Sequence, residues 1–368
     1  MKLFDKILGK KQDNQNIEIE SYEDFWNWFL NHEQEFYKIV KEGKYIEEKF
    51  FDVISPQLKK LNTGYYYLAG MSDEKVAELV ITVDGDIRNI VFAEEIIEAA
   101  PSLDHWKFTA LKSEMDIDRM NIRMGDYSFT KDNIFFYSND IEDYPDEIDL
   151  TFLYDGLTEE NKNITTNGTY IFLDNYLGEL NFATQIDSLG IIGKSEAEKE
   201  LIPIYKLKDF LQWRETEFIE KYKGVKNTEE KDSFTILNAT LASGLPLIAV
   251  VNTSLLKWDH KASYPWISVV KIQYNGEKNN GLPEKDDYAA MDAIEEKMIN
   301  RLNQEEGNLY IGRESAENRR EVFFASKGFR QTPKVFNTIM KEHPEYDISF
   351  DLYKDKYWQS FERYNVTK

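Results

Sequence analysis

The stretch WISVVKIQY, from Trp266 to Tyr274, decides the fold class of the C-terminal third of the chain. Its β-branched and aromatic residues predict a strand. Helical spacing of apolar residues replaces this pattern over residues 286–302 and predicts a helix. The inward positions of that helix are Met291, Ile294, Met298 and Leu302. A strand followed by a helix therefore opens this region.

Four more predicted elements complete the region. Residues 309–313 and 321–325 read as the two strands of a hairpin. Thr332-Pro333 begins a helix, because proline is favoured at the first helical position. Alternating apolar residues over 348–352 predict a last strand. The order strand, helix, strand, strand, helix, strand is the ferredoxin-like βαββαβ pattern, and it places the chain in the α+β class.

Five short pieces within this region form a series. They are Tyr264-Pro265-Trp266, Gly281-Leu282-Pro283, Ile311-Gly312-Arg313, Arg320-Glu321 with Phe323-Phe324, and Asp355 with Trp358. In this order they resemble the bacterial domain-of-unknown-function family 695, although this chain reads Phe-Phe-Ala where the family often has a tyrosine. The resemblance implies no activity. It implies a fold similar to the B-type regulators of ribonuclease E, which inhibit by binding, and a likeness to immunity-type proteins.

Residues 21–225 are predicted to form a helix pair followed by a mixed or antiparallel sheet. Ser21 and Asp24 resemble a capping box before the first helix, and Gly64 is a plausible cap after the second. Helices are also predicted over residues 93–100 and 204–222. Strands are predicted over residues 65–69, 76–83, 106–111, 134–137, 148–154 and 169–173.

Composition divides the chain into four stretches. Residues 1–20 are predicted to be a flexible tail, and residues 21–225 an acidic α+β region with a possible break near 113–120. Residues 226–234 are polar and lack periodicity, which is typical of a linker. Residues 235–368 then form the ferredoxin-like domain.

Acidic charge is concentrated in the N-terminal half. The formal net charge is −22, of which residues 21–225 carry −20. A surface of this charge repels nucleic acid and attracts basic partners, although solubility alone would also account for it. The loop over residues 140–149 holds six acids. They are Asp140, Glu142, Asp143, Asp146, Glu147 and Asp149, and we predict that they contact a partner.

The sequence lacks the residues that several kinds of functional site require. The chain has no cysteine, so disulfides and thiolate metal sites are excluded and a reducing compartment is favoured. Its four histidines are far apart, without metal-ligand spacing. We therefore predict no catalytic, cofactor or metal residues. An N-terminus without a long apolar stretch, and no run of about 18 apolar residues, predict a cytoplasmic protein that does not enter a membrane.

One segment approaches a phosphate-binding loop. Residues 188–195 read SLGIIGKS, against the pattern G-x-x-x-x-G-K-[ST]. The first position is Ser188 instead of glycine, and Pro203 would cut the following helix short. We therefore interpret the segment as a glycine-containing turn before a helix.

Two features of the C-terminal region carry alternative interpretations. Arg313, Arg319 and Arg320 either pair with Glu314, Glu317 and Glu321, which we favour, or form a basic patch for an anion or for the acidic half. Trp358 either packs against the core, which we favour, or serves as an interface anchor. We list Arg313, Arg320 and Trp358 as possible interaction residues.

Taken together, these patterns favour a non-enzymatic binding or regulatory protein, inhibitor-like or immunity-like, whose acidic N-terminal half docks a basic protein. A hydrolase of unrecognised type, using carboxylates and a metal ion, is one alternative. A structural adaptor is another. The sequence does not indicate an oligomeric state.

Overall fold

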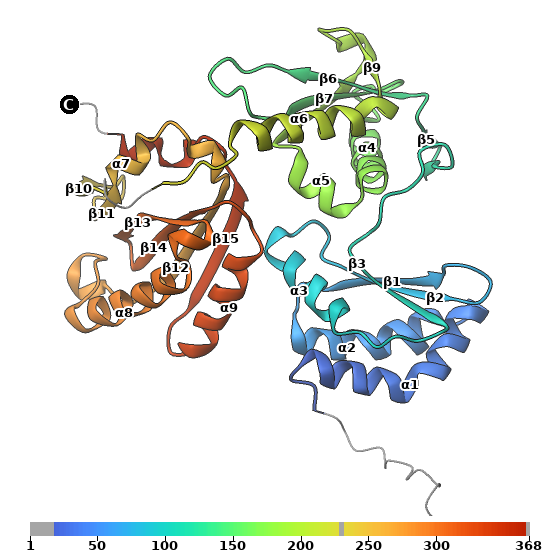
Figure 1. Ribbon diagram of the computed structural model, residues 1–368, viewed down its shortest axis with the longest axis horizontal. Coiled ribbons are helices and arrows are strands. Elements are labelled where there is room, and N and C mark those ends of the chain that lie inside the picture. The colour runs from blue at the N-terminus through green and yellow to red at the C-terminus, as the bar shows by residue number, and fades with distance from the viewer. Residues whose placement is uncertain (1–17, 228–231, 366–368) are drawn as a thin grey trace, which may run out of the picture. The chain divides into compact units, whose positions relative to one another are not determined.

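The computed structural model describes residues 18–227 and 232–365 (Figure 1). The chain divides into two compact units, the first comprising residues up to 82 together with 92–110, and the second 83–91 and 111 onward. Helices alternate with separate mixed and antiparallel sheets, which confirms the predicted α+β class. Among the described residues, no helix combines the length and apolar character needed to cross a membrane. The predicted tail and linker, residues 1–20 and 226–234, fall partly outside the described residues.

The first unit packs two helices on a three-stranded sheet. Its elements are α1 (Tyr22–Glu42), a π-helical turn (Glu47–Phe51), α2 (Asp52–Leu61), β1 (Tyr66–Met71), β2 (Ala77–Thr82), part of α3 (Ile87–Glu98) and β3 (Trp106–Ala110). The predicted capping box is present, because the Asp24 amide donates to the Ser21 hydroxyl and the Ser21 amide to the Asp24 carboxylate. Strand β2 pairs antiparallel with β1 and parallel with β3. The predicted helix pair and mixed sheet are therefore confirmed.

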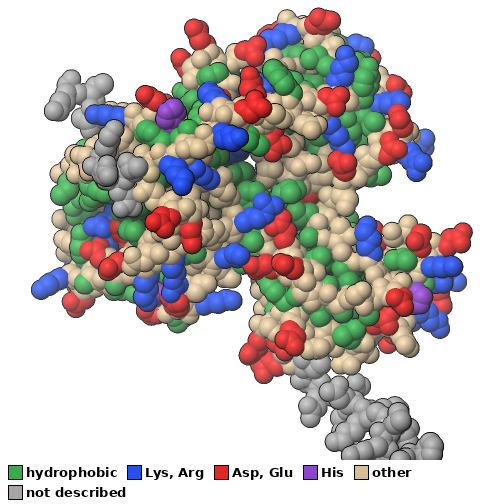
Figure 2. Space-filling model, viewed as in Figure 1, with side chains coloured by type: hydrophobic (Ala, Val, Ile, Leu, Met, Phe, Trp, Pro, Cys, Tyr) green, Lys and Arg blue, Asp and Glu red, His purple; other side chains and the backbone are tan. Residues whose placement is uncertain are grey.

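A two-stranded sheet, a four-stranded sheet and three helices form the first half of the second unit. The elements are β4 (Ile122–Met124), β5 (Tyr127–Phe129), β6 (Ile134–Asn139), β7 (Asp149–Tyr154), α4 (Lys162–Leu177), α5 (Glu179–Gln185), β8 (Ser188–Gly193), β9 (Ile202–Pro203) and α6 (Leu207–Lys221). The strand order in the four-stranded sheet is β8-β7-β6-β9, with β7 and β8 parallel. Figure 2 shows acidic side chains on the visible face of this region, interspersed with basic ones.

The strand predicted over residues 169–173 is wrong, because these residues lie in α4. The run TYIFL is rich in aromatic and branched residues, which favours a strand on local grounds. In the folded chain Thr165, Thr169, Phe172 and Tyr176 are buried at helical spacing against the sheet. Gly168 lets the helix approach closely, since a Cβ there would lie 2.0 Å from the ring of Phe129. Tertiary packing therefore overrides the local preference.

A six-stranded antiparallel sheet forms the C-terminal region. Its elements are β10 (Phe234–Thr240), β11 (Pro246–Asn252), α7 (Thr253–Leu256), β12 (Trp266–Gln273), α8 (Lys285–Arg301), β13 (Asn308–Ala316), β14 (Arg319–Ser326), α9 (Gln331–Glu342) and β15 (Ile348–Lys354). The strand order is β10-β11-β13-β14-β12-β15. The predicted sequence of elements is present from β12 to β15, while the ferredoxin-like likeness stays a prediction. Strand β10, which the sequence analysis missed, pairs only with β11 and forms one edge.

Both faces of this sheet are covered. Helices α8 and α9 pack on one face, where Val270, Met298 and Phe336 are buried together. On the other face, α7 and the segment after β15 bury Leu255 and Trp358 together with other apolar side chains. Because the segment after β15 is part of this second core, residues 355–364 are held against the sheet close to the region built by α5 and α6.

Candidate functional site

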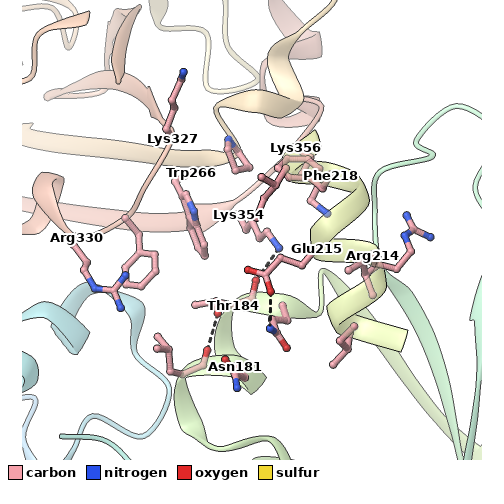
Figure 3. A pocket seen from close by; sticks show the side chains of 17 residues that line it. Asn181, Thr184, Arg214, Glu215, Phe218, Trp266, Lys327, Arg330, Lys354 and Lys356 are labelled. Atoms are coloured by element: carbon pink, nitrogen blue, oxygen red, sulfur yellow. Dashed lines mark hydrogen bonds between the residues drawn. The ribbon is translucent and has the colours of Figure 1, made fainter. Parts of the chain in front are cut away.

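A pocket of about 370 Å³ lies within the second unit (Figure 3). Helices α5 and α6 form one wall, and the starts or ends of β12, β14 and β15 form the other. The lining residues used below are Thr184, Arg214, Glu215, Phe218, Trp266, Lys327, Phe329, Arg330, Lys354 and Lys356. Volumes of this size are typical of small-molecule sites.

The lining is basic, although the protein is acidic. Five of the described lining residues are cations, and Glu215 is the acid among them. Glu215 accepts a hydrogen bond from Gln185, at 3.3 Å. The pocket therefore carries the opposite charge to the chain as a whole, whose formal net charge is −22.

A buried triad of charges forms the floor of the pocket. The ammonium groups of Lys354 and Lys356 each lie 2.7 Å from a carboxylate oxygen of Asp187. Burial alone would raise the pKa of Asp187, but the two lysines outweigh it and lower that pKa. Burial, reinforced by the neighbouring Lys354, lowers the pKa of Lys356 to about 8. Two cations thus share one carboxylate, which leaves a positive excess.

Two further cations donate hydrogen bonds to backbone carbonyls. The Lys327 ammonium donates to the Val225 carbonyl at 2.7 Å. The Arg214 guanidinium donates to the carbonyls of Pro145 and Glu147, at 2.7 and 3.3 Å. In Figure 3 both side chains point away from Trp266. A carbonyl fixes a cation without neutralising it, so the charge of Lys327 still contributes to the potential in the pocket, whereas that of Arg214 is partly offset by Glu217, 3.8 Å away.

Aromatic rings complete the pocket. The rings of Trp266 and Phe329 meet edge-on, with centroids 5.0 Å apart. The Lys354 ammonium lies 5.8 Å from the centre of the Trp266 ring, and the Arg330 guanidinium 4.6 Å from that of Phe329. Phe218 adds a third ring from α6. The pocket therefore offers apolar surface beside its cations.

The sheet side of this pocket lies in a region that matches a known protein family. Residues 240–364 match the family of unknown function DUF695. This match covers the C-terminal third of the chain and confirms the resemblance drawn from the sequence. No curated protein and no solved structure matches the chain. The DUF695 region supplies Trp266, Lys354 and Lys356, whereas α5 and α6 lie outside it.

The acidic loop of residues 140–149 borders this pocket. Asp140, Glu142 and Asp143 are exposed. Asp146 faces inward and binds Lys221, Tyr222 and Tyr357, each at 2.7 Å. Burial would raise the pKa of Asp146, but these partners lower it.

The other two acids of the loop also have internal partners. Glu147 accepts a hydrogen bond from Gln359 at 2.9 Å, and Asp149 accepts one from Asn139 at 3.1 Å. The loop is therefore divided into an exposed half and an anchored half.

The arginines of the β13–β14 hairpin lie elsewhere. Arg313 pairs with Glu295 at 2.8 Å and Arg320 with Asp292 at 2.6 Å, so the acids that they pair with come from α8 and not from the hairpin. Only the predicted pairing of Arg319 with Glu321, at 3.0 Å, is present among the three. The hairpin acids have other partners, since Glu314 accepts from Arg363 and Glu317 from Ser243.

The structure also shows where Trp358 and residues 188–195 lie. Trp358 is 2% exposed and donates its indole N–H to the Tyr264 carbonyl at 3.0 Å, so the ring packs in the core. Residues 188–193 form β8, and a 3₁₀ turn follows instead of the predicted helix. Lys194 pairs with Asp155 at 2.9 Å. In the part of the chain that the structure describes, no group of three metal-ligating side chains gathers.

Sequence reasoning missed the pocket itself. Trp266 was noted only as the start of a strand and as a motif residue, and nothing was inferred from Lys354 and Lys356. Their partner Asp187 lies 169 residues before Lys356. Alternate lysines at the end of the last strand were the one available hint, because residues two apart in an extended segment project to the same side.

Proposed function

We propose that the protein is a non-enzymatic binding protein, inhibitory or regulatory, whose acidic loop docks a basic protein partner. The observation that carries this proposal is the exposed half of the loop. Asp140, Glu142 and Asp143 are exposed, and no cation in the described part of the chain forms an ion pair with them. A basic partner would meet three carboxylates that lack ion-pair partners among the described residues, all within a stretch of four residues.

The anchored half of the loop supports the same proposal. Asp146 is held by three side-chain partners, and the Tyr144 and Glu147 amides close turns on Ile141 and Tyr144 at 3.0 Å. A loop fixed in advance loses less conformational entropy on binding. The three acids are therefore presented on an ordered segment.

Charge on a larger scale also favours a basic partner. Residues 21–225 carry nearly all of the excess negative charge. Such a field accelerates association with a cationic protein and disfavours anionic partners such as nucleic acid. The absence of cysteine is compatible with the cytoplasm, which we propose as the location.

The test compares two charge-matched triple variants. The loop variant is Asp140→Asn, Glu142→Gln, Asp143→Asn. The control is Glu160→Gln, Glu198→Gln, Glu200→Gln, which neutralises three exposed acids outside the loop. A partner captured from the native cell is purified, and its affinity for each protein is measured by calorimetry at two salt concentrations.

We expect the loop variant to bind about tenfold more weakly, since three surface charges contribute roughly 1.4 kcal/mol together. The control should retain its affinity to within about twofold. An equal loss in both variants would show that the attraction is general and that the loop is not the contact. Unchanged affinity in the loop variant would contradict the proposal.

A further inference from the structure

We propose that the pocket between α5 and α6 and the ends of β12 and β15 binds a small organic anion. Its carboxylate or phosphate would face Lys354, and its apolar body would lie against Trp266 and Phe218. This inference is independent of the proposed function, because it concerns a different surface and a ligand of opposite charge to the basic partner.

Charge is the first argument. Among the described lining residues five are cations and one, Glu215, is an acid. Behind the lining, Asp187 pairs with Lys354 and Lys356, Glu217 lies 3.8 Å from Arg214, and the carboxylates of Asp146 and Glu147 also act on Lys356. A concave surface of one charge sign focuses the field and concentrates counter-ions of the other sign. An anion entering the pocket would therefore meet a predominantly cationic lining.

Lys354 is the cation best placed to contact the ligand. Its ammonium contacts Asp187 at 2.7 Å and donates to the Thr184 carbonyl at 2.7 Å. An ammonium has three N–H donors, and the described residues supply no third acceptor. Figure 3 shows Lys354 beside Trp266, on the wall facing α5. The remaining donor is thus available to a ligand oxygen next to an aromatic surface.

The size and the apolar lining argue for an organic ligand. A volume of about 370 Å³ exceeds what an inorganic anion requires. The apolar lining residues are Ile148, Leu180, Leu211, Phe218, Ile219, Pro265, Trp266 and Phe329. Burial of apolar ligand atoms against these side chains would contribute roughly 25 cal/mol for each Å² removed from water. Charge and apolar surface together define the ligand class.

The test uses four small probes and the full chain. Phenyl phosphate and phenylacetate each combine an anion with a ring, and they separate the phosphate from the carboxylate source. Benzyl alcohol keeps the ring without the charge, and inorganic phosphate keeps the charge without the ring. Calorimetry at low salt should give a Kd of about 1 mM or tighter for at least one aromatic anion, and no saturation below about 10 mM for the two controls.

Three variants locate the site. Lys354→Met removes the proposed contact, and Arg330→Gln removes an exposed lining cation beside Phe329. Lys341→Gln makes the same charge change on α9, away from the pocket lining. We expect binding to be lost in Lys354→Met, weakened about threefold or more in Arg330→Gln, and unchanged in Lys341→Gln.

Three binding results would contradict the proposed anion site. Equal affinity for benzyl alcohol and the anions would overturn the role of charge. Equal weakening by Lys341→Gln and Arg330→Gln would show that the whole surface, and not the pocket, attracts anions. Failure of both aromatic anions to bind below about 10 mM would overturn the proposal itself.

Discussion

The hydroxyl of Tyr357 donates a 2.7 Å hydrogen bond to the carboxylate of Asp146, which lies 211 residues earlier in the chain. The same hydroxyl accepts the Asp146 backbone N–H at 3.0 Å. One tyrosine oxygen therefore fixes both the side chain and the backbone of a loop residue. The position of the acidic loop consequently depends on a residue of the DUF695 region.

Replacement of Tyr357 by phenylalanine should loosen this loop. Tyr357→Phe removes a donor and an acceptor while keeping the ring, and we expect a loss of about 1–3 kcal/mol in the free energy of unfolding. Urea denaturation measures the loss, and hydrogen exchange should quicken at the amides of residues 140–147. Tyr205→Phe is the control, because the Tyr205 side chain is 53% exposed. Equal effects of the two changes would contradict the prediction.

Lys356 should make stability depend on pH in the alkaline range. Its pKa falls from 10.5 in the unfolded chain to about 8 in the folded protein. Between these values the unfolded chain binds a proton that the folded protein has released, so stability rises with pH.

The comparison is between the wild type and Lys356→Met. From pH 8 to pH 9.5 the wild type should gain stability relative to the variant, by up to about 1.4 kcal/mol per pH unit. Denaturant melts at several pH values measure this difference. Parallel pH profiles for the two proteins would show that the folded-state pKa of Lys356 is not lowered.

Trp358 should be important for stability. Trp358→Ala removes a ring that is 2% exposed and leaves the Tyr264 carbonyl without its donor, so we expect a loss of about 3–5 kcal/mol. Trp213→Ala is the matched control, since that ring is 58% exposed and should cost less than about 0.5 kcal/mol. Urea melts of both variants compare them. A small loss for Trp358→Ala would instead favour an exposed anchor.

Lys194 should not bind nucleotide. The segment that approaches a phosphate loop is strand β8, paired with β7 along its length, and Lys194 is engaged with Asp155. Calorimetry with ATP and magnesium should give only background heat for the wild type and for Lys194→Ala. Magnesium-dependent ATP binding that Lys194→Ala abolishes would contradict this interpretation of residues 188–195.

The C-terminal region should fold when expressed alone. Residues 235–368 include hydrophobic clusters on both faces of the six-stranded sheet. We therefore expect a cooperative unfolding transition, monitored by circular dichroism and fluorescence. The two probes should give one midpoint. A gradual transition would mean that the contacts to α5 and α6 are needed for the fold.

Local sequence patterns predicted the elements whose signals are local. The element order from β12 to β15 follows from periodicity, and the predicted hairpin is present, with its turn at Glu317 and Asn318, which have φ angles of 49° and 66°. Strand β10 was missed because its residues are mostly exposed on both faces. Residues 169–173 of α4 were predicted to be a strand, because their helical conformation depends on burial against the sheet and not on local sequence preference.

The pocket was beyond sequence reasoning for a different reason. Its cations come from α6, from the end of β14 and from the end of β15, and only the fold brings them together. The acidic loop was visible in the sequence. Its division into exposed and anchored halves was not, because the partners of Asp146 lie 75 to 211 residues away.

Asp187 also sets an order of events during synthesis. The ribosome adds Asp187 169 residues before Lys356, and Lys354 comes only two residues earlier than Lys356. At about 5–20 residues per second, the nascent chain therefore carries this carboxylate for on the order of ten seconds without either counter-ion. Burying an unpaired carboxylate costs several kcal/mol, so we expect Asp187 to stay in contact with water until β15 has emerged. We therefore expect the packing around Asp187 to be completed only once the DUF695 region has been synthesised.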